Sequence, residues 1–265
     1  MKLFFFKILI IIIFYTLSSF SCDDNTENSQ NEMINTIPPE GLLFSFEFNG
    51  NLFSNHGENI NHTSQGGIMY TTDRFVSNHT IMLDGTEDTM LIFENSDAIN
   101  IGFNNMSYSI VICYKTTTPF SIFTSAQLIE KRNGIGSEAY PFSLIVQDSN
   151  IVGVVYDGTT NNSIETSLNS NDSWTQVPFL YNADTQKTLL YTNASLTSEL
   201  DVRTLRSIHN NANFYIGNSK NGIRPFSGGI DDIYIYEKAL STEEISQIFS
   251  PTNYDYTNVT SLSII

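Results

Sequence analysis

The sequence predicts an all-β domain, a sandwich or barrel of many short strands, closed by one short helix near the C-terminus. Apolar residues recur in short runs with a period of two, as where Phe44, Phe46 and Phe48 alternate with polar residues. Turn-forming pairs such as Asp84-Gly85 and Asp157-Gly158 separate the runs. Aromatic residues make up 12% of the 265 residues and charged residues only 15%, which excludes disorder for the bulk of the chain.

The expected strands follow the apolar runs. They fall at residues 44–48, 81–83, 90–93, 108–114, 142–146, 151–156, 174–181, 188–191, 214–216 and 230–236. Many short strands at this spacing are typical of a sandwich or barrel. In the last run, period two places Asp231 and Ile233 on one face and Asp232 and Tyr234 on the other. Because apolar residues occupy both faces, we expect both to be covered and at least one aspartate to be buried.

One helix is expected, at residues 241–249. Ser241 and Glu244 form a capping box, in which each side chain accepts a backbone N–H from the other residue. Ile245, Ile248 and Phe249 share one face, and Pro251 ends the run. This pattern predicts a short amphipathic helix that closes the domain.

The N-terminus reads as an export signal. Lys2 and Lys7 precede or interrupt a short apolar segment, which is followed by small and polar residues up to Ser21. We interpret residues 1–21 as a cleaved signal peptide, 22–39 as a flexible tether, 40–250 as the folded domain and 251–265 as a tail. The apolar segment is shorter than the roughly 20 residues of a spanning helix.

The formal charge is −16 and becomes −18 once the signal is removed, with 10 basic residues left against 28 acidic ones. Such a surface repels nucleic acid, favours solubility and can bind cations. We therefore expect no nucleic-acid partner.

The two cysteines are Cys22 and Cys113, and Cys113 lies in an apolar run, so no disulfide framework is expected.

Residues 17–22, Leu-Ser-Ser-Phe-Ser-Cys, resemble a loose lipobox of the Bacteroidota type, although Ser19 stands where a strict lipobox has leucine. The resemblance implies that Cys22 carries a lipid and tethers the protein to a membrane. The acidic residues that follow resemble the signal for export to the outer membrane or cell surface. The alternative is an ordinary cleaved signal followed by an acidic linker.

Two segments resemble the LamG-like domains of bacterial surface proteins, in the concanavalin A-like lectin/glucanase superfamily. Residues 73–75 with 83–88 resemble its "DRFG…FDG" segment, and residues 226–245 resemble its "F.G.IDD..IY..ALS..EI" ending. Weaker matches occur at 46–51, 129–131, 174 and 190–193. The resemblance implies an all-β fold, a two-sheet antiparallel jelly-roll sandwich, for residues 40–250. The aspartate that usually follows the opening strand is missing from residues 53–59.

The resemblance also implies a candidate metal site. Some relatives bind calcium between the turn after the first strand and the last strand, which points to Asn49, Asn51, Asp231 and Asp232 as ligands of one structural calcium ion. Hard cations take carboxylate, amide and backbone oxygens together. The alternative is that the aspartates accept turn N–H groups or pair with Arg224.

No catalytic constellation is visible. Enzymes on this fold often carry an E-x-D-x-x-E strand, which is absent here, and Glu130 and Glu138 flank a turn where they suit surface acids or loop caps.

Trp174 is expected in the core, and Tyr70, Tyr140 and Tyr156 are possible sugar platforms. The ligand-binding residues stay unknown. We expect a non-catalytic module that binds a glycan or a surface protein, the alternatives being a glycoside hydrolase or lyase and a structural subunit of a surface complex.

Overall fold

The computed structural model describes residues 37–48, 50–54, 56–73, 80–102, 104–117, 125–132, 142–168, 173–203 and 211–249, which all belong to one compact unit, 35–265. The expected signal peptide, Cys22 and the C-terminal tail lie outside the described residues. In the part that the structure describes, no helix combines the length and apolar character needed to cross a membrane.

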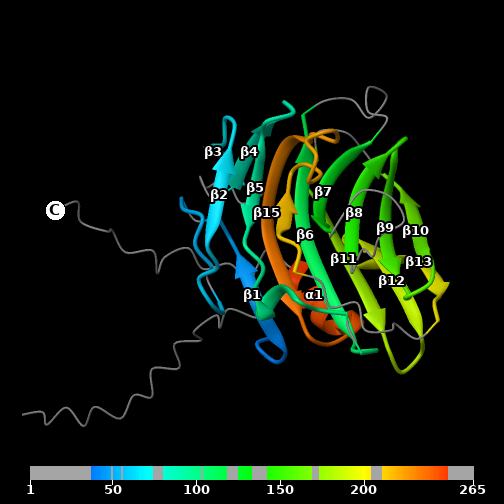
Figure 1. The fold of residues 1–265 in the computed structure, drawn as a ribbon. Coiled ribbons are helices and arrows are strands. Elements are labelled where there is room, and N and C mark those ends of the chain that lie inside the picture. The colour runs from blue at the N-terminus through cyan, green and yellow to red at the C-terminus, as the bar shows by residue number, and fades with distance from the viewer. Residues whose placement is uncertain are drawn as a thin grey trace, which may run out of the picture. The chain divides into compact units, whose positions relative to one another are not determined.

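Two antiparallel sheets stack face to face, as Figure 1 shows. The eight-stranded sheet has the order β13-β12-β11-β6-β15-β4-β3, and β1 also pairs with β15. Its strands are β1 (Leu42–Phe46), β3 (Met69–Thr71), β4 (Thr80–Asp84), β6 (Tyr108–Thr116), β11 (Thr175–Asn182), β12 (Lys187–Thr192), β13 (Ser195–Asp201) and β15 (Ser227–Tyr236).

The seven-stranded sheet has the order β10-β9-β8-β7-β14-β5-β2. Its strands are β2 (His62–Gln65), β5 (Met90–Phe93), β7 (Ala126–Lys131), β8 (Phe142–Gln147), β9 (Asn150–Tyr156), β10 (Asn161–Ser167) and β14 (Phe214–Ile216). A 3-10 helix, η1 (Asp97–Ile99), follows β5. The predicted all-β sandwich is thus confirmed.

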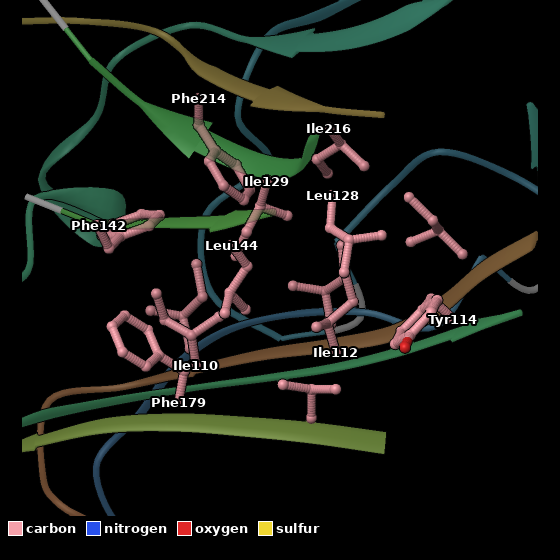
Figure 2. Close-up of a cluster of buried hydrophobic side chains, with 14 of the residues drawn as sticks. Ile110, Ile112, Tyr114, Leu128, Ile129, Phe142, Leu144, Phe179, Phe214 and Ile216 are labelled. Atoms are coloured by element: carbon pink, nitrogen blue, oxygen red, sulfur yellow. The ribbon is translucent and has the colours of Figure 1, made fainter. Parts of the chain in front are cut away.

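The main core lies between the sheets. Side chains that alternate along β6, such as Ile110 and Ile112, face Leu128 and Leu144 of the opposite sheet (Figure 2). Phe44, Phe46 and Phe48 are buried in the same cluster, as their alternation predicts. Aligned packing of two sheets in this way produces a core about 10 Å thick.

A second, smaller cluster covers part of the outer face of the eight-stranded sheet. The helix α1 (Thr242–Phe249) places Ile245 and Ile248 against Tyr234 and Tyr236 of β15. The predicted capping box is present, because Ser241 N–H donates to Glu244 Oε2 at 2.9 Å and Glu244 N–H donates to Ser241 Oγ at 3.2 Å. The helix therefore starts where the sequence indicates.

The packed domain begins slightly before the expected boundary at residue 40. Pro38 is buried, and Ile37 packs against the second cluster, so both differ from the flexible tether that the sequence predicts for residues 22–39. The Leu42 N–H also donates to the carbonyl of Pro39 at 3.3 Å. The last three residues of the expected tether thus belong to the folded unit.

Candidate functional site

The predicted aspartates lie on β15, where a β-bulge changes the expected faces. Asp231 pairs with Cys113 and Tyr234 pairs with Val111, so one extra residue is inserted between these two pairs. Asp232 occupies it with a φ of 46°, in the left-handed region. After the bulge, Ile233 and Ile235 face the main core and Tyr234 faces outward, which explains the apolar residues on both predicted faces.

Both aspartates are buried, with 2% of each residue exposed, as expected of at least one of them. The Tyr234 hydroxyl donates to Asp232 Oδ1 at 3.3 Å. Neither aspartate pairs with Arg224 in the described residues. Asp231 shares a cross-strand row on the outer face with Cys113 and Gln176.

The expected calcium ligands are only partly brought together. Asn49 lies outside the described residues. Asn51 is exposed, and its Oδ1 accepts the Phe53 N–H at 2.9 Å, so this oxygen is already committed to a turn. The pairing of Phe46 with Ile233 brings the end of β1 beside the bulge. Calcium takes six to eight oxygens, and no group of three or more His, Cys, Asp or Glu side chains suited to a metal occurs among the described residues.

Trp174 is half-buried and belongs to neither apolar cluster, contrary to its expected place in the core. Its indole lies on the outer face of β15, against Gly229. A Cβ at Gly229 would come within 2.8 Å of Trp174 Cη2, so the close approach of the ring requires glycine.

Of the three tyrosines predicted as possible sugar platforms, Tyr70 is 40% exposed, Tyr156 is half-buried and Tyr140 lies outside the described residues.

Glu130 is buried, so it is not a surface acid, but it does cap a loop by accepting a backbone N–H of the turn after β14. It lies in β7 on the outer face of the seven-stranded sheet, beside Tyr215 of β14. Its Oε1 accepts the Lys220 N–H at 3.0 Å and lies 3.8 Å from Arg132 Nε. Its Oε2 has no hydrogen-bond partner among the described residues. Burial, and then the charge of Glu130, raise the pKa of Tyr215.

The next residue, Lys131, is buried among neutral groups. Its Nζ donates to Asn95 Oδ1 at 2.7 Å and to the Ala212 carbonyl at 2.6 Å. Burial lowers the pKa of Lys131 to about 8, because no carboxylate in the described part of the chain offsets the cost of desolvating the ammonium group. Lysine is rarely buried in this way.

A pocket of about 170 Å³ opens where the strand ends meet at one end of the eight-stranded sheet. We call it the η1 pocket. It is lined by Leu43 of β1, Asp97 of η1, Asn100 after η1, Ile101, Gly102, Met106 and Ser107 before β6, and Glu237 after β15. The register explains the arrangement, since Tyr236 pairs with both Leu42 and Ser109, so β1 and β6 start where β15 ends.

Asn100 is the unusual residue of the η1 pocket. It is 7% exposed, and neither its Nδ2 nor its Oδ1 has a hydrogen-bond partner among the described residues. Most buried polar groups are paired, so each exception needs an explanation. Gly102 fixes the neighbouring backbone at a φ of 75°, where a Cβ would lie 2.8 Å from the Tyr108 ring.

The rim of the η1 pocket is acidic. Asp97 and Glu237 both line it and are exposed, and neither side chain has a hydrogen bond or ion pair within the described residues. The adjacent Lys238 does not neutralise Glu237, because its Nζ lies 2.6 Å from Glu244 and 3.7 Å from Glu40. Leu43, Ile101 and Met106 supply an apolar wall. The pocket thus offers uncommitted donors and acceptors beside apolar surface.

Sequence reasoning missed the η1 pocket. Asparagine is so abundant in this chain that Asn100 carries no signal, and Asp97 and Glu237 lie far apart in the sequence. The short spacing of Asp97 and Asn100 after a strand was the one local feature that could have pointed to a turn with exposed polar groups.

The sequence model of the concanavalin A-like lectin/glucanases superfamily matches residues 84–246. The chain belongs to this superfamily. The match covers more than half of the chain and runs from the last residue of β4 through β15 and most of α1. The predicted jelly-roll family is therefore confirmed.

Several solved structures share the fold. The binding domain of Paraclostridial Mosquitocidal Protein 1 has a TM-score of 0.66 at 20% identity, over 79% of this chain and 52% of that one. The botulinum neurotoxin serotype D binding domain has a TM-score of 0.66 at 16% identity, over 82% and 51%. The binding domain of botulinum neurotoxin DC, in complex with SialylT, has a TM-score of 0.65 at 17% identity, over 82% and 52%. The chain thus spans about half the length of these structures, and it matches none of the curated proteins.

Proposed function

We propose that this protein is a non-catalytic carbohydrate-binding module, exported from the cytoplasm and held at the outer membrane or cell surface by a lipid on Cys22. The η1 pocket carries the binding part of the proposal. There the buried Asn100 carboxamide and the Asp97 and Glu237 carboxylates are all uncommitted within the described residues.

A sugar suits this arrangement. A carboxamide both donates and accepts, and a carboxylate accepts from neighbouring hydroxyls, so together they match the donors and acceptors of a sugar ring. Leu43 and Met106 provide apolar surface for its C–H groups. The pocket is smaller than the roughly 300–1,000 Å³ of a drug-sized site. It therefore suits one sugar unit, such as the end of a chain.

The relatives support a binding role and not a particular ligand. The superfamily includes lectins and glucanases by its name, and the matched solved structures are described as binding domains. One of them is in complex with SialylT. Because this chain spans about half of each, their ligands are only a guide to the class of molecule to test.

A glycan array tests the proposal. The purified protein is expected to bind at least one glycan class, and Asn100→Ala is expected to abolish that binding without unfolding the protein. Asn182→Ala serves as a matched control, since Asn182 is the last residue of β11, lies outside the pocket, and has an Oδ1 that accepts two backbone N–H groups. A folded protein that binds no glycan but captures a neighbouring surface protein would favour the structural-subunit alternative.

The enzyme alternative depends on Glu130, a buried carboxylate with one oxygen that has no partner in the described residues. Canonical glycoside hydrolysis requires a second carboxyl group about 5–9.5 Å away. We expect no release of reducing sugar from any polysaccharide that the protein binds. Release that is lost in Glu130→Gln, with binding retained, would overturn the non-catalytic assignment.

A further inference from the structure

The charge around the η1 pocket restricts the kind of sugar that it can hold. Asp97 and Glu237 lie on its rim, and no lysine or arginine is among the residues that line it. Lys238 is directed to Glu40 and Glu244 instead. A ligand carboxylate or sulfate would therefore meet two negative charges and, among the lining residues that the structure describes, no cation.

We propose that the η1 pocket selects a terminal sugar without negative charge and prefers one that carries a free amine. This inference rests on the proposed carbohydrate binding and adds the chemical class of the ligand. The Asn100 carboxamide, buried and without a partner in the described residues, binds the hydroxyls of any sugar that enters. The carboxylates of Asp97 and Glu237 then pair with an ammonium group and repel an anion.

The mixture of polar and apolar residues that line the η1 pocket favours a sugar over a bare cation as its ligand. Leu43, Ile101 and Met106 face the same pocket as the two acids and Asn100. Hard cations are surrounded by oxygen ligands and gain nothing from apolar neighbours. A sugar buries its C–H face against such residues while its polar groups are bound at the rim.

The size of the preference follows from the exposure of the acids. Exposed ion pairs contribute little individually, and two of them together favour a cation by roughly fivefold in affinity. The same charges disfavour an anionic sugar by a similar factor. The preference weakens as the salt concentration rises, since exposed charges are screened.

An NMR titration tests the selectivity. The folded protein is titrated with glucosamine and galactosamine, their N-acetyl forms, glucuronate and N-acetylneuraminate, while the side-chain amide of Asn100 is followed. We expect the free amines to bind roughly fivefold more tightly than the N-acetyl forms, and the anionic sugars to bind more weakly than either. In Asp97→Asn/Glu237→Gln the ratio of amine to N-acetyl affinity is expected to fall to about one.

Asp88→Asn/Glu243→Gln is the matched control. It removes the same charge at exposed acids, one in the turn before β5 and one in α1, and neither lines the pocket. It is expected to keep the amine preference. Loss of the preference in the control as well would show general attraction to an acidic protein and overturn the proposal, as would equal or tighter binding of an anionic sugar.

Two further outcomes separate this inference from the proposed function. Sugars that bind without shifting Asn100 would leave carbohydrate binding standing and exclude the η1 pocket. A folded protein that binds no sugar of any charge, on the array or in the titration, would overturn both. Calcium chloride alone is titrated in parallel, and a shift of Asn100 with calcium but with no sugar would make this a cation site and contradict the inference.

Discussion

Replacing Asn100 with leucine is expected to stabilise the free protein while it abolishes sugar binding. Leucine has a similar size but no polar atoms, so it removes two buried groups that have no partner among the described residues. A buried unpaired polar group costs about 1–3 kcal/mol. Even with imperfect repacking, the free energy of unfolding should rise by about 1 kcal/mol, which is about 2–4 °C in Tm for a domain of this size.

Asn218→Leu is the control for this prediction. Asn218 is also buried, but its Nδ2 donates to the Glu87 carbonyl at 2.9 Å and its Oδ1 accepts from Ser219 and Arg224. Leucine there leaves three backbone groups without a partner, and we expect a loss of about 3 kcal/mol. The two variants should therefore move Tm in opposite directions.

Urea unfolding and thermal melts of both variants, with array binding measured alongside, complete the test. A gain in stability combined with a loss of binding is the pattern expected of a residue kept for function at a cost in stability. If Asn100→Leu destabilises the protein as much as Asn218→Leu does, the Asn100 carboxamide has a structural partner and the reasoning about the η1 pocket fails.

Four other variants or conditions test the remaining features. Lys131 has a folded-state pKa of about 8 against an ordinary 10.5, so between these pH values the unfolded chain binds more protons than the folded one, and the free energy of unfolding rises with pH. From pH 7 to 9.5 the wild type should gain about 2 kcal/mol in urea unfolding relative to Lys131→Met. Equal pH profiles of the two proteins would contradict this. Ser241→Ala removes the N-terminal cap of α1 and should lower the free energy of unfolding in urea by about 1 kcal/mol. An unchanged urea midpoint would contradict this. If Asp231 and Asp232 hold calcium, a chelator should lower Tm at neutral pH, and no shift excludes the ion. If Cys22 carries the lipid, Cys22→Ala should move the protein from the membrane to the soluble fraction, and retention at the membrane excludes that anchor.

The sequence predicted the buried strands and missed most of the exposed ones. The runs at 108–114 and 230–236 stand out because their apolar residues are buried in clusters between the sheets or under α1. By contrast, β10 (Asn161–Ser167) and β13 (Ser195–Asp201) lie at sheet edges, where most residues are exposed and polar. Their pairing with a neighbouring strand, which local pattern does not reveal, makes them strands.

Buried polar residues hide strands from the sequence pattern in another way. The strand β7 was missed because it carries Gln127, Glu130 and Lys131, all fully buried, so its pattern is not apolar. The bulge at Asp232 depends on one residue in a left-handed conformation, which reverses the faces that period two predicts. Both features are set by tertiary neighbours.

The candidate site could be predicted even less. The aspartates of β15 were located from a family motif, and the structure confirms that they are buried. The η1 pocket joins Leu43, Asn100 and Glu237, which lie up to 194 positions apart and meet only because β1 and β6 both flank β15. Its importance comes from missing hydrogen bonds, which are visible only once the side chains are placed.

The most direct test of carbohydrate binding at the η1 pocket is the crystal structure of the protein with a glycan identified on the array. The proposed binding at the η1 pocket predicts a terminal sugar there, with its hydroxyls hydrogen-bonded to the Asn100 carboxamide and to Asp97 or Glu237. A sugar bound elsewhere, for example on the outer face of the seven-stranded sheet beside Glu130, would contradict it.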